Sequence, residues 1–169
     1  MTIITVTGTP GTGKTTVARL VAQACNFGYI DVHSLIVDKK LYSSYNKMLN
    51  TYEVSPNRLN KVLLHLANKV KKGAVIDSHL SHYLPKKSVT LCIVIVCELK
   101  TLAGRLKKRG YSERKIRENT DAELFRICLL EAEKRHSPVL IIDTTHHIPS
   151  LLLKKVITNE LSSRIRKLK

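Results

Sequence analysis

Apolar residues along the chain fall into short unbroken runs separated by stretches with helical spacing. The runs lie at residues 2–8 (TIITVTG), 29–31 (YID), 74–77 (AVID), 89–97 (VTLCIVIVC) and 138–143 (PVLIID). Runs that are apolar on both faces are typical of parallel strands that helices cover on both sides. The alternation of these strands with helices predicts a three-layer α/β fold with a parallel sheet of about five strands.

The segments between the runs carry apolar residues at the spacing of helices. The helix at 55–73 has the clearest limits, because Ser55 stands at its N-cap, Pro56 at its first position and Gly73 at its end. The polar stretch at 42–54, which contains three tyrosines, is expected to be a mobile insertion. The other expected helices lie at 14–23, 32–41, 100–110, 112–135 and 149–169.

Composition is typical of a globular protein. Apolar residues make up 43% of the 169 positions, the mean hydropathy is −0.08, and no run reaches the roughly 18 apolar residues of a membrane span. No repeat or Gly/Ser/Pro-rich linker divides the chain, so we expect one domain over residues 1–169. Met1 leads directly into the first strand rather than a signal peptide, so we expect a cytoplasmic protein without membrane contact. The four cysteines form no CxxC pair, so we expect neither a disulfide nor a zinc site.

The charge balance is strongly basic. Twenty-nine Lys and Arg residues face 13 Asp and Glu residues, which gives a net charge of +16. Such an excess favours binding to polyanions such as nucleic acid, although an evenly solvated basic surface is an alternative explanation. Aromatic residues are only 5% of the chain and follow no repeated pattern, so any contact with RNA is expected to be with its backbone.

Residues 8–16, GTPGTGKTT, match the P-loop template and stand between the first strand and the first helix, as that template requires. Glycines let successive backbone N–H groups point at phosphate oxygens, and the helix N-terminus adds its positive dipole end. Lys14 would supply a charge for the β and γ phosphates, Thr15 a ligand for Mg²⁺, and Thr16 a contact near the α phosphate. A Gly-rich turn without function is the alternative, and the strand and helix around the motif argue against it.

The strand AVID delivers Asp77 to the C-terminal edge of the sheet, where open α/β sheets bind their ligands. Asp77 is therefore a candidate to hold Mg²⁺ through a water molecule, in the manner of a Walker B aspartate. His79, two residues later, is a candidate to orient a water molecule or the phosphate acceptor, although a histidine beside a strand end is more often structural.

Basic residues gather in two further segments. Residues 105–117 hold seven of them, which would form a flap that closes over a triphosphate, or else a solvated helix face or RNA patch. Residues 154–169 form either an RNA-contacting helix or, in the interpretation we favour, a core-packed helix with a solvated basic face. The segment DTTHH at 143–147 follows the last strand and is expected to form a loop near the adenine base.

Together these motifs resemble the nucleoside monophosphate kinases, and most closely the adenylate kinase 6 family of small archaeal and nuclear proteins. The resemblance rests on TGTPGTGKTT, on the Asp-x-His of IDSHL, on RLKKRGYSERKIREN and on the following Glu123-Leu124-Phe125, and it spans residues 3 to about 135. It implies a P-loop kinase core of five parallel strands, a segment for the acceptor nucleotide (NMP) near 31–54 and a small basic lid near 110–120. It also implies ATP and Mg²⁺ as cofactors, transfer to AMP or another NMP, and a slower ATPase activity.

The same resemblance implies roles for particular residues. Lys14, Asp77, His79 and Arg109 would be catalytic, and Thr15 and Asp77 would hold Mg²⁺. ATP would be bound by Gly11, Gly13, Lys14, Thr15, Thr16 and Arg109. Family members act in maturation of the small ribosomal subunit, which implies a uS11-type ribosomal protein and pre-rRNA as partners.

One position departs from the family pattern. Val37 stands where the family tends to place an arginine for the acceptor phosphate, and a substitute from Lys39 or Lys40 would lack the bidentate fork of arginine. Three functions are therefore considered: an ATP:AMP phosphotransferase with ATPase activity, an ATP-driven assembly factor with little AMP transfer, and another small-metabolite kinase. The intact basic lid favours the first, and the missing arginine favours the second.

Overall fold

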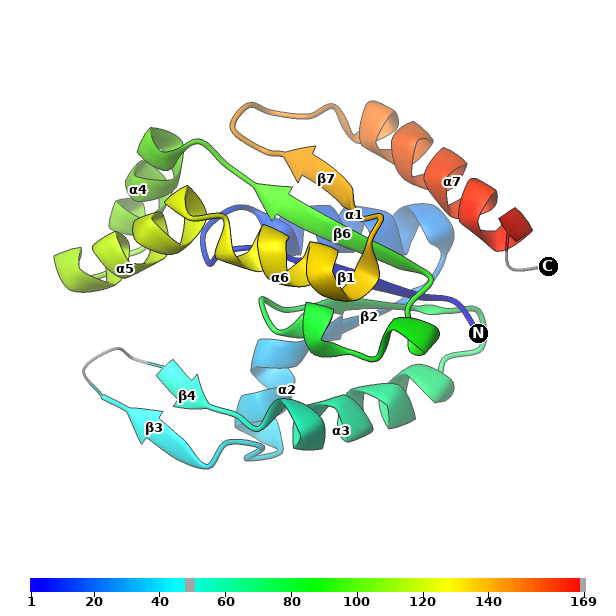
Figure 1. Cartoon of the computed structure of the whole chain (residues 1–169), viewed down its shortest axis with the longest axis horizontal. Helices are drawn as coiled ribbons and strands as arrows, with labels where there is room; N and C mark the ends of the chain where they lie inside the picture. The colour runs from blue at the N-terminus through cyan, green and yellow to red at the C-terminus, as the bar shows by residue number, and fades with distance from the viewer. Residues whose placement is uncertain (48–50, 168–169) are drawn as a thin grey trace.

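The computed structural model of the protein describes residues 1–47 and 51–167. Its main sheet has five strands, all parallel, in the order β2-β5-β1-β6-β7 (Figure 1). The five predicted strands are therefore confirmed, with β1 at the centre of the sheet. The strands are β1 (Ile3–Thr7), β2 (Gly28–Asp31), β5 (Ala74–Asp77), β6 (Leu91–Val96) and β7 (Leu140–Asp143).

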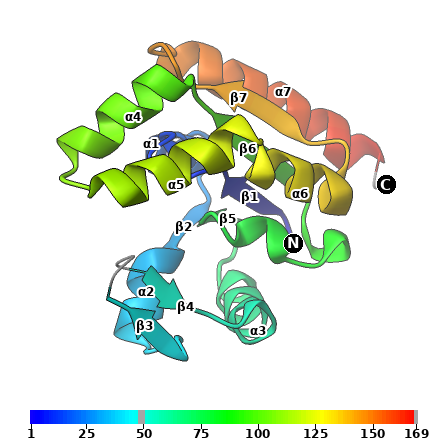
Figure 2. The same cartoon turned by 60° about the vertical axis from the view of Figure 1, so that its left-hand side comes forward.

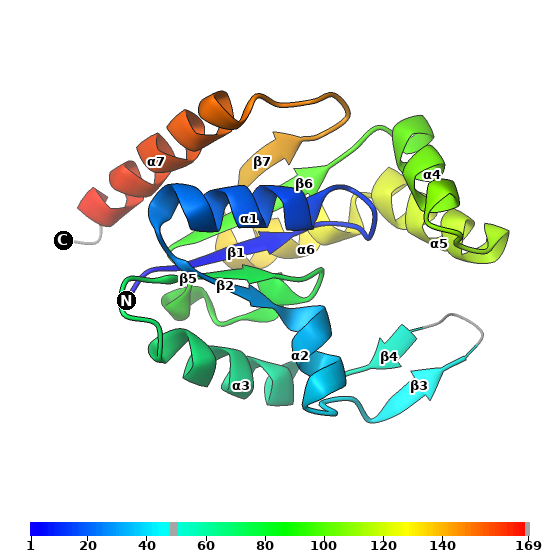
Figure 3. The ribbon, with the colours of Figure 1, turned by 180° about the vertical axis from the view of Figure 1, so that it is seen from behind.

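Helices cover both faces of this sheet. On one face lie α1 (Lys14–Cys25) and α7 (Ser150–Lys167), and on the other lie α3 (Pro56–Asn68) and α6 (Ile127–His136) (Figures 1 and 3). The side chains of β1 alternate accordingly, because Ile4 and Val6 pack with α1 and α7 whereas Ile3 packs with α3. The predicted three-layer α/β fold is confirmed.

Two pairs of elements project beyond the C-terminal edge of the sheet. Helices α4 (Leu99–Lys108) and α5 (Glu113–Leu124) run antiparallel to each other there, and buried Leu102 and Leu106 of α4 pack with Ile116 of α5 (Figure 2). The hairpin of β3 (Ser44–Asn46) and β4 (Thr51–Glu53) projects at the same end of the molecule (Figures 1 and 3). The C-terminal edge of the parallel sheet therefore lies between these two projections.

The prediction of a single helix over residues 112–135 is wrong. The chain forms α5 and then α6, and Arg126 between them has a left-handed backbone with φ of 51°. The break allows α5 to pack on α4, while α6 turns onto the sheet and buries Leu129 and Ala132 against β6. Both halves have helical apolar spacing, so the sequence pattern did not indicate the change of direction.

The segment at 42–54, predicted as a mobile insertion, contains the β3–β4 hairpin, which the sequence did not predict. Tyr45 and Tyr52 lie opposite each other in the antiparallel pair, with ring centroids 5.0 Å apart, and Tyr42 also contacts Tyr52. Aromatic cross-strand pairs stabilise such ribbons. Residues 48–50 of this segment lie outside the described residues. The preceding helix α2 (Val32–Asp38) ends three residues before its predicted end.

The helix predicted for 55–73 is confirmed in kind and is shorter. Ser55 precedes α3 and Pro56 is its first residue, but the Ser55 side chain makes no capping hydrogen bond. The helix ends at Asn68, and Gly73, with φ of 155°, lies directly before β5. Gly73 therefore serves the entry to the strand rather than the end of the helix.

Candidate active site

The P-loop connects the central strand β1 to α1 and is shaped by three glycines with positive φ, Gly8, Gly11 and Gly13. A side chain at Gly8 would be impossible without movement, because its Cβ would lie 2.3 Å from the carbonyl oxygen of Ile95. The loop is closed on itself, since the backbone N–H and the hydroxyl of Thr12 both donate to the carbonyl of Thr9. These features give the tight turn that a phosphate-binding loop needs.

Lys14 begins α1, and its ammonium group folds back over the loop to donate to the Thr9 carbonyl at 2.9 Å. Burial lowers the pKa of Lys14 to about 8, and the negative charge of Asp77 opposes that shift. The ammonium group therefore lies over the loop in a poorly solvated place where an anion would stabilise its charge. Thr15 and Thr16 follow in the first turn of α1 and are both exposed.

Asp77 ends β5 beside the P-loop strand, at the register position of Val6. Its carboxylate is nearly buried, with 6% exposed, and accepts a hydrogen bond of 2.8 Å from the hydroxyl of Tyr29 on β2. Burial, followed by this bond to Asp77, raises the pKa of Tyr29 to about 12, so the phenol remains a donor at physiological pH. Tyr29 fixes the orientation of the carboxylate.

His79 lies in the loop that follows β5, two residues beyond Asp77. His79 is exposed to solvent, but protein atoms also surround much of its side chain. That burial lowers the pKa of His79 to about 4, and the positive charge of Lys14 acts in the same direction. His79 is therefore neutral at physiological pH. Its backbone carbonyl lies 3.3 Å from the Thr7 hydroxyl oxygen.

A pocket of about 470 Å³ extends from the P-loop toward the start of α7. Arg105 and Arg109 of the α4 segment line it, together with Gly11 and Gly13 of the P-loop. His146 and His147 line the same pocket, which agrees with the prediction that DTTHH forms a loop beside the nucleotide site. The structure thus brings the phosphate loop, the basic segment and the loop after β7 around one cavity.

The two arginines of this pocket differ in their contacts. The Arg105 guanidinium donates to the carbonyl of Thr144 at 2.6 Å and to that of Thr12 at 3.3 Å, so it connects the loop after β7 to the P-loop. The Thr144 hydroxyl also donates to the Thr12 carbonyl. Arg109 ends α4 and is exposed. Arg105 is therefore held by the framework, whereas Arg109 is available to a ligand.

Glu123, near the end of α5, connects the helical projection to the phosphate loop. One carboxylate oxygen accepts from the Thr9 hydroxyl at 2.5 Å, and the other accepts from the backbone N–H of Cys97 at 2.9 Å. Sequence reasoning gave Glu123 no role beyond its place in the family motif, and it missed Tyr29 and Thr144. Their partners lie 26 or more residues away along the chain, so spacing gave no signal for them.

The residues fit a magnesium-bound triphosphate. The turn at Gly8 leaves no room for a side chain, and Lys14 occupies a place that an anion would stabilise. Thr15 and Asp77 offer the oxygen ligands that Mg²⁺ prefers. Among the described residues there is no group of three or more His, Cys, Asp or Glu that could hold a metal ion. Mg²⁺ at this edge would therefore take its remaining ligands from phosphate and water.

A P-loop at the centre of a five-stranded parallel sheet, with an aspartate at the end of the next strand and arginines over the loop, defines the class of P-loop kinases. Solved structures agree with this class. A shikimate kinase from Acinetobacter baumannii superimposes with a TM-score of 0.68 at 18% identity, covering 96% of this chain and 94% of its own. A gluconokinase from Sinorhizobium meliloti gives a TM-score of 0.64 at 15% identity, covering 99% and 95%. These similarities concern the fold alone.

Sequence comparison is more specific. A family model described as an AAA domain matches residues 4–126. A Pyrococcus furiosus protein named "Putative adenylate kinase" is 37% identical, over 98% of this chain and 87% of its own. An "Adenylate kinase isoenzyme 6 homolog" of Schizosaccharomyces pombe is 33% identical, over 92% and 86%. The chain belongs to the adenylate kinase isoenzyme 6 family and is an adenylate kinase-like nucleotide kinase with a P-loop. Within the described residues, every helix is too short or too polar to cross a membrane.

Proposed function

We propose that the protein is an ATP:AMP phosphotransferase that also hydrolyses ATP slowly. The observation that carries the proposal is the pocket of about 470 Å³, because glycines of the P-loop, Arg105 and Arg109, and the loop after β7 all line it. A nucleotide in this pocket would have its base toward the loop after β7 and its phosphates toward Lys14. Membership of the adenylate kinase isoenzyme 6 family supports the same activity and AMP as the acceptor.

In this proposal the P-loop N–H groups and Lys14 hold the phosphates of ATP. Thr15 would hold Mg²⁺ directly, and Asp77, oriented by Tyr29, would hold it through water. When bound, the ion would supply positive charge that offsets the negative charge developing during transfer. Thr16 would contact the α phosphate. Burial lowers the pKa of Lys14 even though the negative charge of Asp77 opposes the shift, so a triphosphate would add compensation for the buried charge.

The lid near 110–120 and the acceptor segment near 31–54 complete the proposed site. The lid residues belong to the turn after α4 and to the first part of α5, and the hairpin belongs to the acceptor segment. Both project at the C-terminal edge of the sheet (Figures 1 and 3). Closure of the lid would bring Arg109 onto the transferring phosphoryl group and exclude water. The acceptor oxygen would then attack in line from the hairpin side.

His79 is proposed to serve the hydrolytic reaction. Its neutral imidazole, with a pKa lowered to about 4, offers a nitrogen that accepts a hydrogen bond from water at physiological pH. A protonated imidazole has a hydrogen on both ring nitrogens and could not accept that bond. Its positive charge would also be repelled by Lys14. His79 is therefore assigned the orientation of water when no acceptor nucleotide is present.

A second candidate is an ATP-driven assembly factor that acts on a uS11-type ribosomal protein or pre-rRNA and transfers little phosphate to AMP. Two observations favour it: the net charge of +16, and the exposed Val37 where the family tends to have arginine. Lys39 and Lys40 follow the end of α2, whose seven residues separate them from Asp31 at the sheet edge. At about 1.5 Å per residue, α2 separates them from that edge by roughly 10 Å.

A coupled assay of ADP formation tests both candidates. Purified protein is given ATP alone and then ATP with each nucleoside monophosphate in turn. The first candidate predicts a large stimulation by AMP or one other monophosphate, and the second predicts a rate that no acceptor changes. Lys14→Ala should lower both activities about a hundredfold or more, because it removes the cation at the transferring phosphate.

Lys61→Ala is the matched control, since Lys61 is an exposed residue of α3 outside the proposed site. It should leave both rates unchanged. Near-normal ATP consumption by a folded Lys14→Ala protein would contradict the site assignment. Strong phosphorylation of a small metabolite without any response to monophosphates would point to the third function that the sequence left open.

A further inference from the structure

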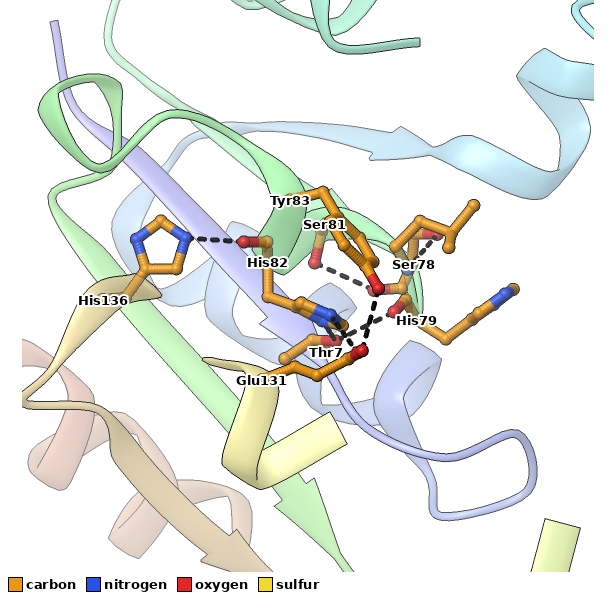
Figure 4. A network of polar contacts seen from close by, with 9 residues as sticks. Thr7, Ser78, His79, Ser81, His82, Tyr83, Glu131 and His136 are labelled. Carbon is orange, nitrogen blue, oxygen red and sulfur yellow. Dashed lines mark hydrogen bonds and ion pairs between the residues drawn. The ribbon is translucent and has the colours of Figure 1, made fainter. Parts of the chain in front are cut away.

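A chain of polar contacts, buried at Thr7 and His82 and partly exposed at Glu131, lies directly behind His79 (Figure 4). The Thr7 hydroxyl lies 2.7 Å from Nδ1 of His82, and Nε2 of His82 lies 3.0 Å from a carboxylate oxygen of Glu131. Thr7 is the last residue of β1, His82 belongs to the short 3-10 turn η1 (Ser81–Tyr83), and Glu131 belongs to α6. Thr7 is fully buried, and His82 is 1% exposed. The chain therefore joins the strand that leads into the P-loop to the loop that carries His79.

The positions of the protons in this chain follow from its geometry. The Glu131 carboxylate only accepts, so Nε2 of His82 carries the proton that lies between them. Burial lowers the pKa of His82, with the contact to Glu131 opposing the shift, so the ring is neutral and Nδ1 is an acceptor. The Thr7 hydroxyl has one proton and two acceptors, Nδ1 of His82 at 2.7 Å and the carbonyl of His79 at 3.3 Å. The shorter contact takes the proton.

Other contacts hold the two ends of the chain in place. The second oxygen of Glu131 accepts from the Tyr83 hydroxyl at 3.0 Å, and Arg135 lies over the Tyr83 ring at 4.5 Å. His136, also buried, contacts the carbonyl of His82 at 2.8 Å. Figure 4 shows the His79 ring turned away from the His82 ring, so the chain does not reach the reacting atoms itself.

We propose that His82 and Glu131 are positioning residues that act on His79 through Thr7. With Glu131 fixing the tautomer of His82, the Thr7 hydroxyl is held at Nδ1, and the loop from Ser78 to Tyr83 is fixed relative to the root of the P-loop. Ser81 adds a second link, because its hydroxyl contacts the carbonyl of Val6 at 3.1 Å. This inference rests on the proposed role of His79 in hydrolysis.

A pair of substitutions separates the two halves of the His82 contact. In His82→Asn the side-chain amide reaches the place of Nδ1, so it accepts from Thr7 and loses Glu131. In His82→Gln the amide reaches the place of Nε2, so it contacts Glu131 and loses Thr7. Glu131 is proposed to act only by fixing the tautomer of His82, and an amide side chain has no tautomer to fix. His82→Gln, which loses the link to Thr7, should therefore lower kcat for ATP hydrolysis about tenfold, as loss of an orienting partner commonly does. His82→Asn should retain kcat within about threefold, in keeping with orienting contacts that survive.

Thr7→Val tests the same link from the other side. Thr7→Val should lower kcat as His82→Gln does. The double variant Thr7→Val/His82→Gln should lose no more kcat than either single variant, because both substitutions remove the same contact between Thr7 and residue 82. The Kd for ATP should change less than about twofold in all four variants, since neither Thr7 nor His82 lines the pocket beside the P-loop. Lys61→Ala is the control, because Lys61 is exposed on α3 and belongs neither to this chain of contacts nor to the proposed site. It should leave kcat unchanged.

A purely structural role predicts losses of kcat that follow the melting temperature of each variant and add in the double variant, and either result would overturn the proposal. Equal losses in His82→Asn and His82→Gln would overturn it as well. Imidazole ¹⁵N chemical shifts give an independent readout. We expect the Nε2-protonated tautomer for His82, and the Nδ1-protonated tautomer would contradict the proposed hydrogen bonds to Thr7 and Glu131. If the wild-type protein hydrolyses no ATP, the proposed ATPase activity itself fails. The tautomer of His82 still tests the proposed hydrogen bonds.

Discussion

At the scale of single residues, Lys14 is positioned before any ligand arrives. Its ammonium group spans the loop to the Thr9 carbonyl, and burial has already lowered its pKa to about 8. A triphosphate that replaces the carbonyl as partner restores the charge that burial disfavours. Binding of ATP and protonation of Lys14 are therefore linked.

This linkage predicts that ATP binds more weakly as the pH rises through 8. The free protein loses the Lys14 proton with a pKa of about 8, whereas the phosphate-bound form keeps it to higher pH. Binding above pH 8 must then take up a proton, and Kd should rise about tenfold between pH 7 and pH 9. Calorimetry at the two pH values measures the change, and buffers of different ionisation enthalpy count the protons.

Lys14→Arg serves as the control for this measurement, because a guanidinium group stays charged over the same range. Its affinity for ATP should be lower and should not vary between pH 7 and pH 9. A wild-type Kd that is the same at both pH values, without proton uptake, would show that Lys14 is not the group that meets the phosphates.

The sequence located candidate site residues where a local motif marks their positions. Asp77 and the P-loop lie next to strand ends, so one strand pattern and one template locate them, and the structure places them at the same sheet edge. Sequence reasoning failed for Tyr29 and Glu123, because a tyrosine on a strand or a glutamate on a helix has nothing in its neighbourhood to mark a partner 48 or 114 residues away. Such contacts become visible only once the sheet order is known.

At the scale of elements, the projection of α4 and α5 depends on the turn between them. Gly110 in this turn has φ of 73°, whereas Gly104 lies within α4. A Cβ on either glycine would meet no atom within 4 Å. The two positions therefore differ in backbone conformation and not in available space.

This contrast predicts opposite effects of alanine on stability. Gly104→Ala should raise the free energy of unfolding by about 0.5–1 kcal/mol, because alanine is the better helix former. Gly110→Ala should lower it by about 1 kcal/mol, because a left-handed backbone strains any residue with a Cβ. Urea unfolding of both variants beside the wild type measures the difference. Changes of the same sign would show that the turn relaxes out of its left-handed form.

The elements themselves show where sequence patterns stop being informative. Strand runs identified all five strands of the parallel sheet, because burial on both faces leaves a strong signal. The same reasoning joined α5 and α6 into one helix, since apolar spacing continues through Phe125 and Arg126. It also missed the β3–β4 hairpin, whose three-residue strands pair through tyrosines and lack an apolar face. Short elements and changes of direction depend on tertiary packing, which a local pattern does not record.

At the scale of the whole molecule, topology explains why one edge carries the chemistry. All strands of the main sheet are parallel, so their carboxyl ends meet at one edge, with the P-loop strand β1 between β5 and β6. The helix α7 lies on the same face of the sheet as α1. It buries Leu153, Ile157 and Leu161 in the core that also includes α1. The favoured prediction of a core-packed final helix is therefore confirmed for its described residues, Ser150–Lys167.

The net charge of +16 is also a property of the whole molecule, and it leads to the last prediction. Lys154 and Lys155 lie on the exposed side of α7, and Lys71 and Lys72 are exposed after α3. If general charge attracts nucleic acid, Lys154→Glu/Lys155→Glu and Lys71→Glu/Lys72→Glu should weaken binding to a single-stranded RNA equally. Each should also make the dependence of affinity on salt less steep, because fewer counterions are released. Fluorescence anisotropy at several salt concentrations measures both quantities.

A loss confined to the α7 pair would instead identify that face as a dedicated RNA surface. Unchanged melting temperatures are the control, because both pairs lie outside the core.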